Sequence, residues 1–523
     1  MSQPLHKRPL MCATSTLRFK MPLSYVCPSW QGVSTILILY LVGIVLYRLT
    51  LHPLARFPGP KLAAITRLYE AYYDIILDGQ YTFKLKELHK IYGPIIRISP
   101  YELHIHDPLF LNTLYNHDIM EKYAWSYDAH TAKGSTAFTV DHYLHRARRQ
   151  PLNAAFSRTK VYSSQYMIQF YVDKLCQRIS GYVGTTFDLG AASLAFTQDV
   201  ANDFIMRKTY SSLDREDFDV AMLVVLQGAG RVWRLNKHLR WYGHILKALP
   251  LNLLSKVAGD TLRIFLFRLR EQYQETEDQV KRATFSSTKD RTMTPRTIVN
   301  DILDSKLPRS DKTVQRIYED VSTVCNAAFE TTASVLRLVL FHVFSNPNIL
   351  RRLRTELDSI KTIELKTLEQ LPYLTSVLKE GLRLGGGTST RLQRVSDKDL
   401  FYGEWRIPAG HPVGMTALLI HIDDDVYQNA KSFVPERWMD VENMKWSEKA
   451  FVPFSKGSRI CLGMHLAWAE LYIVVATVVQ RFDFTFPNTT AEDFICDSDQ
   501  FLIQTRAKGH LCAIPTLVSI QAC

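Results

Sequence analysis

The feature that most constrains the fold is a long stretch, residues 311–345, that contains neither glycine nor proline. Ser310 or Asp311 can cap a helix that starts here, and Asn346-Pro347 stops it. At about 1.5 Å per residue such a helix is ~50 Å long, which is enough to cross a domain of this size. We therefore expect it to run through the core of one large helical domain.

Shorter segments complete a mainly α fold with a small β part, an α+β arrangement. A second helix is expected to start at Pro372, which suits a first-turn position, and to end in the glycines 385–387. Three β-like stretches follow, with turns at Gly403 and Gly410. The stretches are Arg391–Val395, Leu400–Ile407 and Val413–Leu418.

The N-terminal region has a composition of its own, because residues 21–47 carry no charged side chain. A spanning helix needs ~20 mostly apolar residues, so we predict a transmembrane helix at about 30–47. A cleaved signal peptide is the competing interpretation, but no small-residue cleavage site of the A-x-A kind precedes Arg48. The pattern favours a retained, single-pass membrane anchor.

Charges beside this helix favour a cytosolic body after it. The flanking cations are Arg18 and Lys20 before the helix, and Arg48, Arg56, Lys61 and Arg67 after it. Phe57-Pro-Gly-Pro60 follows as a stiff hinge, because two prolines prevent regular structure there. No internal repeat or second composition break follows, so we divide the chain into 1–56, the anchor and linker, and 57–523, a single folded domain.

Charge and cysteine usage exclude two classes of protein. The 63 Lys and Arg exceed the 51 Asp and Glu by 12, which suits an anionic membrane surface or an acidic protein partner. These cations form no basic run, so nucleic-acid binding is not expected. The eight cysteines form neither CxxC pairs nor a closely spaced disulfide framework, which indicates a reducing compartment.

Four short motifs occur in order along the chain. They are Ala327–Thr332 (AAFETT), Glu380–Arg383 (EGLR), Pro435–Trp438 (PERW) and Phe454–Gly463 (FSKGSRICLG). The last motif surrounds Cys461 with glycine, lysine and arginine, whereas a structural cysteine usually has apolar neighbours. Cys325 has such neighbours and is expected to be a small core residue.

With these motifs the chain resembles the cytochrome P-450 monooxygenases. The cysteine loop matches the family pattern FxxGxRxCxG, and the other three match its ExxR helix, its PERF-like loop and its oxygen-activating segment. The likeness covers essentially the whole chain. The sequence from Arg67 to the cysteine loop further resembles the fungal secondary-metabolite branch, near trichodiene oxygenase. The resemblance implies the cytochrome P-450 fold and a haem-thiolate monooxygenase domain at 57–523.

The resemblance makes Cys461 the proximal ligand of a haem b iron. A thiolate ligand needs backbone N–H groups close to its sulfur, and Gly457 and Gly463 give the chain the freedom to bring them there. Arg459 can pair with a haem propionate, and Phe454 can cover the sulfur side of the ring. Cysteine ligation pushes electron density onto iron and favours O–O cleavage.

Two further sets of residues are carried over from the family. Glu380 and Arg383 lie on one helix face, and the Glu380 carboxylate can pair with both Arg383 and Arg437. The role of these three residues is structural. Three other residues are propionate candidates, and His145 stands where the family usually has Trp. The candidates are Arg149, His145 and Arg394. Outside this context, an ExxR pattern and lone basic residues are typical of solvated helix faces.

Glu330 and Thr331 place an acid and a hydroxyl side by side on the core-crossing helix, which is costly without a purpose. A hydroxyl with an acid behind it can deliver protons while bulk water is excluded. The alternative is a Thr331 hydroxyl bonded to the i−4 carbonyl, with Glu330 on a solvated stripe. Ala328 occupies the place where many relatives have Gly, and it still leaves room for a small ligand.

The sequence therefore predicts a monooxygenase that inserts one oxygen atom from O₂ into a hydrophobic small molecule, with a terpenoid favoured. The resemblance implies electrons from NADPH through a flavoprotein reductase, NADPH cytochrome P-450 reductase, docking on the Cys461 face near Lys456. It also implies an endoplasmic reticulum membrane location with the catalytic domain cytosolic. Two alternatives are a haem-thiolate isomerase or dehydratase that needs no reductase, and a non-catalytic haem-binding carrier or sensor.

Overall fold

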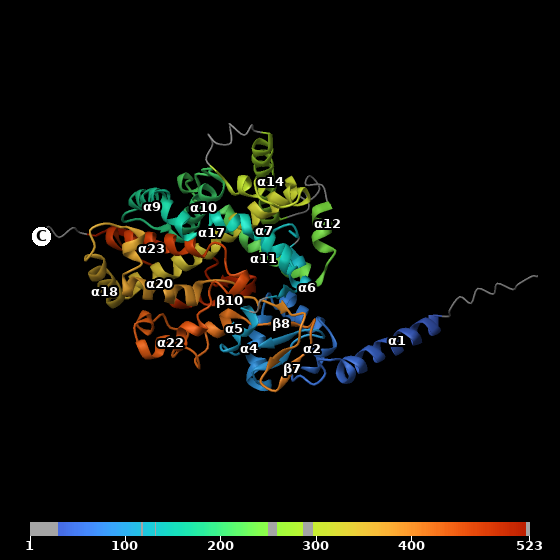
Figure 1. Cartoon of the computed structure of the whole chain (residues 1–523). Coiled ribbons are helices and arrows are strands. Elements are labelled where there is room, and N and C mark those ends of the chain that lie inside the picture. Colours follow the sequence, from blue (N-terminus) through green and yellow to red (C-terminus); the bar gives the residue numbers. More distant parts are fainter. Residues whose placement is uncertain (1–29, 117–118, 131, 249–258, 286–295, 519–523) are drawn as a thin grey trace, which may run out of the picture.

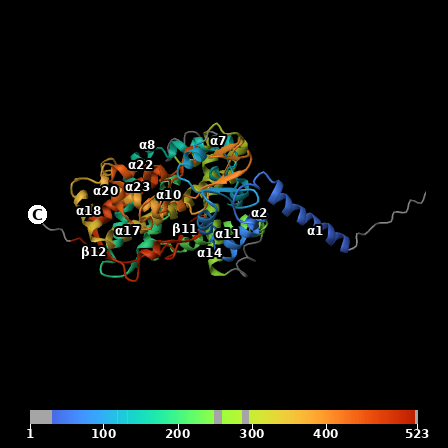
Figure 2. The ribbon, with the colours of Figure 1, turned by 90° about the horizontal axis from the view of Figure 1, so that it is seen from below.

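The computed structural model describes residues 30–116, 119–130, 132–248, 259–285 and 296–518. A helical part makes up most of the body, and one group of strands lies at the end from which the N-terminal helix projects (Figure 1). The view turned by 90° shows the same projection (Figure 2). The predicted α+β architecture, mainly helical, is confirmed.

Helix α17 (Val314–Ser345) is the predicted core helix. It packs against α10 (Leu189–Met206), α14 (Asp260–Phe285), α20 (Pro372–Gly385) and α23 (Met464–Arg481). Apolar side chains over most of its C-terminal half are buried in the main core. The helix thus crosses the domain as its length requires.

The predicted cap of α17 was wrong. Ser310 and Asp311 lie in a separate 3₁₀ turn, and the Thr313 hydroxyl accepts a hydrogen bond from the Arg316 N–H at 3.3 Å. The Asp311 carboxylate instead forms an ion pair with Arg148 at 2.6 Å. The Asp311 side chain, which the local sequence predicted as a helix cap, therefore pairs instead with Arg148, a residue distant in the sequence.

The remaining helices surround this core. The longer ones are α4 (Tyr81–Tyr92), α7 (His142–Ala155), α9 (Gln165–Ser180), α11 (Ala221–His238), α12 (Tyr242–Ala248), α18 (Pro347–Leu357) and α22 (Val441–Ala450). The short ones are α2 (Lys61–Ile65), α3 (Leu68–Ala71), α5 (Phe110–Tyr115), α6 (Ala124–Tyr127), α8 (Arg158–Ser163), α16 (Ile298–Leu303), α19 (Leu365–Leu368) and α21 (Ala417–His421). Helix α20 has the predicted bounds, from Pro372 to the first of the three glycines.

A five-stranded sheet brings distant parts of the chain together in the order β1-β2-β8-β5-β3. Its strands are β1 (Ile95–Arg97), β2 (Leu103–Ile105), β8 (Pro412–Gly414), β5 (Arg394–Val395) and β3 (Glu121–Lys122). Only the β2–β8 pair in this sheet is parallel. The register Lys122↔Arg394 places two cations side by side.

The other sheets are small. They are the hairpin β6 (Leu400–Tyr402) and β7 (Trp405–Ile407), the sheet β4 (Phe187–Asp188), β12 (Cys512–Leu517) and β9 (Phe482–Thr485), and the pair β10 (Cys496–Gln500) and β11 (Leu502–Thr505). Gly403 turns the predicted hairpin with φ 54°. The prediction of strand over Val413–Leu418 was wrong after Gly414, because the apolar run Leu418–Ile420 lies in helix α21.

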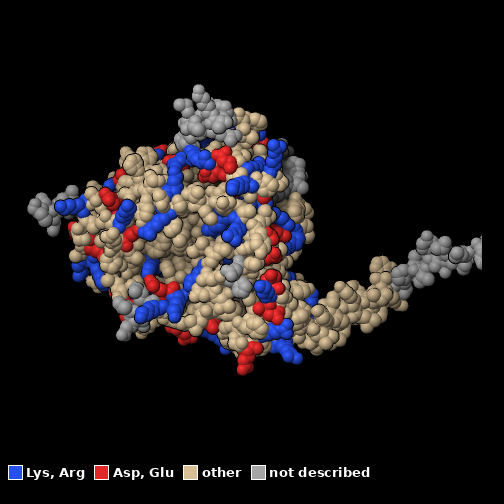
Figure 3. Space-filling view, viewed as in Figure 1, with Lys and Arg blue, Asp and Glu red and all other residues tan. Residues whose placement is uncertain are grey.

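Helix α1 (Trp30–Leu46) continues through a π-helical turn to Leu51. The most apolar 18 residues of this helix have a mean hydropathy of 2.0, and none of that stretch is buried. Helix α17 also passes this test of length and composition, but 72% of its apolar stretch is buried and it belongs to the core. In Figure 3, α1 is an uncharged rod, and Lys and Arg are scattered over the visible face of the body.

The segment after α1 is held firmly against the body. Leu54 is completely buried, and the Arg97 N–H donates to the Pro58 carbonyl oxygen at 2.7 Å. Gly59 has φ 149°, and a Cβ there would lie 2.4 Å from the Arg97 carbonyl oxygen. The body's contacts therefore begin before residue 57. The cations Arg18 and Lys20 lie outside the described residues.

Candidate active site

A cavity of about 350 Å³ lies between α17, α7, the start of α23 and the five-stranded sheet. Most of its wall is apolar. Eight of the predicted site residues line it, namely Cys461, Phe454, Arg459, Gly463, Arg149, His145, Arg394 and Thr331. Gly457 and Glu330 do not line it. One cavity thus collects side chains of predicted site residues that are up to 316 positions apart in the sequence, from His145 to Cys461.

Cys461 lies in the loop that leads into α23. Its N–H donates to the Phe454 carbonyl oxygen at 3.0 Å, which closes the loop, and its accessible surface faces the cavity. Burial raises the pKa of the Cys461 thiol, while the backbone at Gly463 and Met464 and the Arg149 guanidinium act in the opposite direction. The last three groups favour the thiolate, which is the form that binds a metal.

The two glycines of this loop differ in their surroundings. Gly457 has φ 73°, and a Cβ there would lie 1.8 Å from the Tyr115 carbonyl oxygen, so the loop needs glycine to contact α5. A Cβ at Gly463 would meet nothing within 4 Å. Only Gly463 lies beside the sulfur. Phe454 lines the cavity and packs on Trp468, with 6.3 Å between ring centroids.

Four cations line one part of the cavity wall: Lys122, Arg149, Arg394 and Arg459. Each donates to a backbone carbonyl oxygen, and within the described ranges none has a carboxylate at ion-pair distance. These bonds are Lys122 to Ala137 at 2.6 Å, Arg149 to Ile460 at 2.6 Å, Arg394 to Gln393 at 2.9 Å and Arg459 to Val140 at 2.7 Å. The Arg459 Nε is buried without a partner.

This cluster fits a ligand with two carboxylates, such as haem with its propionates. Burial, together with Arg394, Arg459 and Arg149, holds the pKa of Lys122 well below its ordinary value. Clustered, partly buried cations without counterions are costly, so an anion bound among them would stabilise the site. The thiol on the same cavity supplies the metal ligand. The donor set therefore matches both ends of a haem group.

His145 lies one helical turn before Arg149 on α7 and is buried. Burial lowers its pKa to about 2, and Arg459, Lys122 and Arg149 add to the shift. The imidazole is therefore neutral at physiological pH and can donate one N–H hydrogen bond. A tryptophan indole is also neutral and donates one hydrogen bond, so His145 can replace the Trp that the family usually has at this position.

Thr331 and Glu330 point in different directions from α17. The Thr331 hydroxyl faces the cavity and donates to the Ala327 carbonyl oxygen at 2.7 Å, which is the i−4 bond of the alternative interpretation. The Glu330 carboxylate forms an ion pair with Arg337 and lines a separate cavity of about 40 Å³ beside β10 and β11. Glu330 therefore lies on neither the main cavity nor a solvated stripe.

The expected structural triad is present in the structure. Glu380 is completely buried and accepts two hydrogen bonds from Arg383 at 2.8 Å, and one from Arg437 at 3.0 Å. The Trp438 indole and the Val434 N–H also donate to it, at 3.0 and 2.8 Å. Although burial raises the pKa of Glu380, Arg383 and Arg437 hold it below its ordinary value.

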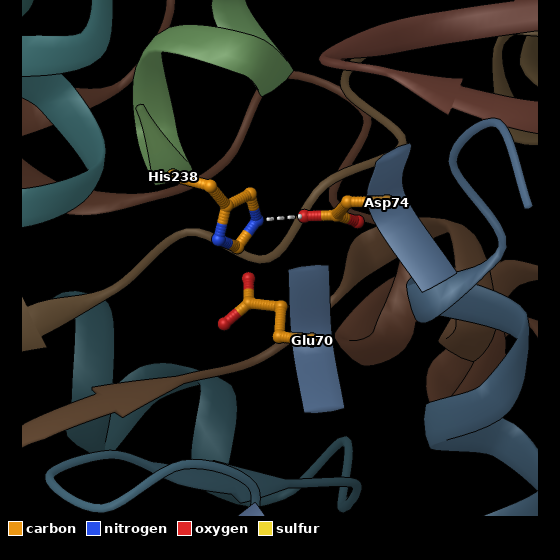
Figure 4. A group of neighbouring side chains, drawn as sticks. All are labelled: Glu70, Asp74 and His238. Carbon is orange, nitrogen blue, oxygen red and sulfur yellow. Dashed lines mark hydrogen bonds and ion pairs between the residues drawn. The ribbon is translucent and has the colours of Figure 1, made fainter. Parts of the chain in front are cut away.

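A second buried charge cluster contains Glu70, Asp74 and His238 (Figure 4). His238 lies 2.9 Å from Asp74, and the Lys237 ammonium lies 2.8 Å from Glu70 and also pairs with Asp74. An ammonium group already supplies the positive charge that these carboxylates need. The cluster is therefore an ion-pair network that ties the end of α11 to residues 70–74.

Lys122 was missed in the sequence, because it belongs to no motif and reaches the site only through the β3–β5 pairing. Glu470, a buried acid on α23 that also lines the main cavity, was missed as well. A signal for Glu470 was available, since it is the only charged residue from Met464 to Gln480.

Comparisons with known proteins agree with this geometry. The family model "Cytochrome P450" matches residues 70–512. Tryptophan 6-hydroxylase fscE of Fusarium equiseti is 36% identical, covering 89% of this chain and 93% of that protein. N-acetyltryptophan 6-hydroxylase ivoC of Emericella nidulans is 34% identical, covering 91% and 94%.

A solved structure, retinoic acid bound cyanobacterial CYP120A1, has a TM-score of 0.66 at 19% identity, covering 85% of this chain and 96% of that one. This likeness supports the fold alone. The predicted family, fold and monooxygenase class are confirmed, and the narrower likeness to trichodiene oxygenase stays a prediction. With a family match over most of its length and a cavity that joins Cys461 to four cations, the chain belongs to the cytochrome P450 family of haem monooxygenases.

Proposed function

We propose that this haem monooxygenase is held in the endoplasmic reticulum membrane by residues 1–56, with domain 57–523 cytosolic, and takes electrons from NADPH through a flavoprotein reductase. The observation that carries the assignment of the site is one cavity with the Cys461 thiol, four cations and the Thr331 hydroxyl on its wall. When bound there, a thiolate-ligated haem supplies O₂ activation.

Each residue around the cavity then has a physical task. Cys461 holds the iron, and Arg149, Arg394, Arg459 and Lys122 neutralise the propionates. His145 donates a neutral hydrogen bond. Phe454 and the other apolar wall residues keep water from the sulfur, which limits proton leakage. Gly463 keeps backbone donors near Cys461, while Gly457 shapes the loop. Glu380, Arg383 and Arg437 support the fold around the cysteine loop.

Proton supply is the task of the residues on α17. The Thr331 hydroxyl can exchange its bond to Ala327 for one to an oxygen in the cavity. Glu330 contributes from another face of the helix, where its carboxylate pairs with Arg337. Ala327 and Ala328 are small and line the cavity beside Thr331, which leaves room for a bound diatomic ligand.

The substrate is proposed to be a hydrophobic intermediate of secondary metabolism. Aromatic rings at Tyr115, Tyr127, Phe138 and Phe501 line the cavity with aliphatic side chains, which suits a terpenoid or a planar aromatic scaffold. Two relatives are named for hydroxylation of tryptophan and N-acetyltryptophan. Spectral titration with a terpenoid panel and an indole panel distinguishes the two classes.

Reductase coupling separates this proposal from its alternatives. Lys456 near the Cys461 loop and the net charge of +12 suit an acidic flavoprotein partner. Substrate-dependent consumption of NADPH and O₂ with added reductase is expected. An isomerase or dehydratase would turn over without NADPH, and a carrier or sensor would bind ligand without consuming either.

Removal of residues 1–46 should release the protein from membranes at high salt and leave its haem content unchanged. This deletion takes away α1 but keeps Leu54, which is buried in the body. Removal of residues 1–56 should also release it, with lower stability, because the Leu54 contacts are lost. Sedimentation and haem absorbance measure both effects.

Continued sedimentation of the shorter deletion would contradict α1 as the sole anchor. It would point to the exposed apolar side chains of Leu68, Tyr72 and Ile76, which recur every fourth residue after the anchor and are 73%, 51% and 69% exposed. Loss of haem from this deletion would show instead that α1 supports the fold.

Thr331→Ala should divert electrons from NADPH into hydrogen peroxide while haem binding is retained. The change removes the hydroxyl on the cavity wall and leaves Cys461 and the cations untouched. General acid assistance is typically worth about 10²- to 10⁴-fold, so even the lower end would let peroxide release dominate. Peroxide formed per NADPH consumed is the measurement, and Glu330→Gln should have a milder effect.

Thr276→Ala is the matched control, because Thr276 makes the same i−4 hydrogen bond, to Gln272 at 2.8 Å, on α14 away from the cavity. If Thr331→Ala and Thr276→Ala give the same peroxide yield as the wild type, Thr331 is not on the proton route.

A further inference from the structure

The tip of the β10–β11 hairpin has an unusual backbone. Phe501 is the one residue between Gln500 and Leu502, which pair with each other, and its φ is 73°. Bulky residues rarely adopt this left-handed conformation, because their Cβ crowds the backbone. Phe501 is only partly buried, and it lines the main cavity. A strained residue therefore presents an aromatic ring to the site, and such outliers tend to occur where function requires them.

The buried carboxylate of Asp499 holds this conformation in place. Asp499 is 5% exposed and does not line the main cavity. Its Oδ1 accepts the Phe501 N–H at 2.9 Å and the Ser389 hydroxyl at 2.8 Å, and its Oδ2 accepts the Thr82 hydroxyl at 2.6 Å. A buried carboxylate is costly unless hydrogen bonds satisfy it. One of the bonds that satisfy Asp499 fixes the backbone of the strained residue itself.

The hairpin tip is bonded to the rest of the body on both sides of Phe501. Before the tip, the Asp499 N–H donates to the Gly79 carbonyl oxygen at 3.1 Å. At the tip, the Ser389 N–H donates to the Phe501 carbonyl oxygen at 3.1 Å. Helix α11 also packs on β10 (Figure 1). These contacts keep Phe501 in a conformation from which a free turn would relax.

Aromatic rings behind the cavity wall hold the Phe501 side chain. Its ring lies edge-on to His130 and Trp233, with centroids 4.5 and 5.3 Å apart. The other face of this group is Phe138, which stacks on His130 with 3.9 Å between centroids. Phe138 lines the main cavity, whereas His130 and Trp233 do not. Two aromatic side chains of the wall are thus supported by the same pair of buried rings.

These rings are separate from the groups assigned to haem. The thiol and the four cations come from the Cys461 loop, α7, β3 and β5, whereas the rings come from His130, Phe138, α11 and the hairpin tip. Leu502, next to Phe501, lines both the main cavity and the smaller cavity of Glu330 on α17. The hairpin tip therefore lies beside α17, and haem binding does not account for Phe501.

We propose that Phe501 is a specificity-determining residue and that Asp499 is the positioning residue that holds its ring on the cavity wall. The inference rests on the proposed function of this cavity. The ligand is a hydrophobic molecule that packs an apolar face on the Phe501 ring. Asp499 touches no ligand and acts only by fixing the left-handed turn. Its loss lets the turn relax and moves the ring from its place.

The test titrates the full-length, haem-loaded ferric protein with imidazole and with 4-phenylimidazole, and the spectral shifts give both dissociation constants. Imidazole is too small to need the apolar wall, whereas the phenyl group packs on it. We expect Phe501→Gly to weaken 4-phenylimidazole relative to imidazole by about two- to tenfold, the effect of losing an aromatic pair. Asp499→Ala should give the same change, and the double variant should add nothing further.

Asp499→Asn is the conservative variant and should keep the wild-type ratio of the two constants. Its amide oxygen can accept the Phe501 N–H and the Ser389 hydroxyl, and the Thr82 hydroxyl can turn to accept from the amide nitrogen. Phe218→Gly is the matched control. Phe218 is another buried phenylalanine with a positive φ, 52°, and it does not line the main cavity. Its replacement costs packing but should leave the ratio unchanged.

Backbone strain at Phe501 has a readout of its own. Phe501→Gly and Phe501→Ala remove the same ring contacts, but only glycine adopts a φ of 73° without steric cost. The glycine variant should therefore unfold at the higher urea concentration. The opposite order would show that the turn is not left-handed in solution, and it would remove the role of Asp499.

Two further results would overturn the proposal. An unchanged ratio in Phe501→Gly would make Phe501 a structural residue only. A change in Phe501→Gly that Asp499→Ala does not reproduce would show that Asp499 does not position the ring. If Asp499→Ala yields no folded protein, Ser389→Ala, which removes one donor to Asp499, should give a smaller change in the same direction, and an unchanged ratio there counts equally against the proposal. Failure of the wild type to bind either imidazole, by contrast, would count against the proposed haem site itself.

Discussion

Glu380→Ala should leave little folded, haem-binding protein. The change removes the only carboxylate among the described residues that pairs with Arg383, whose side chain is completely buried, and it also deprives Arg437 of its ion-pair partner and the Trp438 indole of its acceptor. Breaking a buried ion pair by removing one partner costs about 3–5 kcal/mol. Since a domain has only about 5–15 kcal/mol of stability, this is a large fraction of the total.

The urea midpoint and the haem retained after purification measure this effect. Lys379→Ala is the matched control on the same helix, because Lys379 pairs with Glu448 at the surface and such pairs contribute at most about 1 kcal/mol. A Glu380→Ala protein that unfolds at the wild-type midpoint would show that the triad is not structural.

The same triad predicts how stability depends on pH. The pKa of Glu380 is lower in the folded protein than in the unfolded chain, where it is about 4.3. Its stabilising contribution is therefore complete above that value and is lost as pH falls through the lower, folded pKa. The urea midpoint of the wild type should drop in acid more steeply than that of Glu380→Gln.

Local sequence was sufficient for the parts of the fold that depend on local physics. The uninterrupted residues 314–345 form one helix, and Pro372 and the glycines after Leu384 bound the next. Prediction from the sequence failed where contacts with distant residues determine the structure, or where a short apolar run gives no clear pattern. Asp311 pairs with Arg148 instead of capping α17, and the apolar run Leu418–Ile420 is helical because short apolar runs carry no clear period.

The candidate site likewise contains some residues that the local sequence predicts and others that only the folded structure brings there. The cysteine loop is contiguous, so its residues could be assigned from sequence, whereas Lys122 reaches the cavity through the pairing of two-residue strands. Glu330 and Thr331 were expected to act side by side. Adjacent helix positions project about 100° apart, so the two side chains need not face the same cavity. In the structure Thr331 lines the main cavity, and Glu330 lines the smaller cavity beside β10 and β11.

Cys461→Ser should cause the largest functional loss of any single substitution. The serine hydroxyl is a poor ligand for iron and remains protonated, so it cannot supply the negative charge that the thiolate gives. The cations, the triad and the apolar wall are unchanged, and the protein should still fold. Reductase-dependent activity should disappear, and haem content should fall.

Cys325→Ser is the control for the loss of a thiol. Cys325 is 1% exposed on α17, does not line the cavity, and its pKa is raised to about 12 by burial alone. Its replacement should weaken packing slightly and leave the haem spectrum intact.

The most direct test of the account is therefore the absorption spectrum of the reduced, CO-bound protein, measured for the wild type, Cys325→Ser and Cys461→Ser. The account predicts the red-shifted Soret band of thiolate-ligated iron in the first two and its complete absence in Cys461→Ser. A red-shifted band that persists in Cys461→Ser would contradict the assignment of Cys461 as the iron ligand.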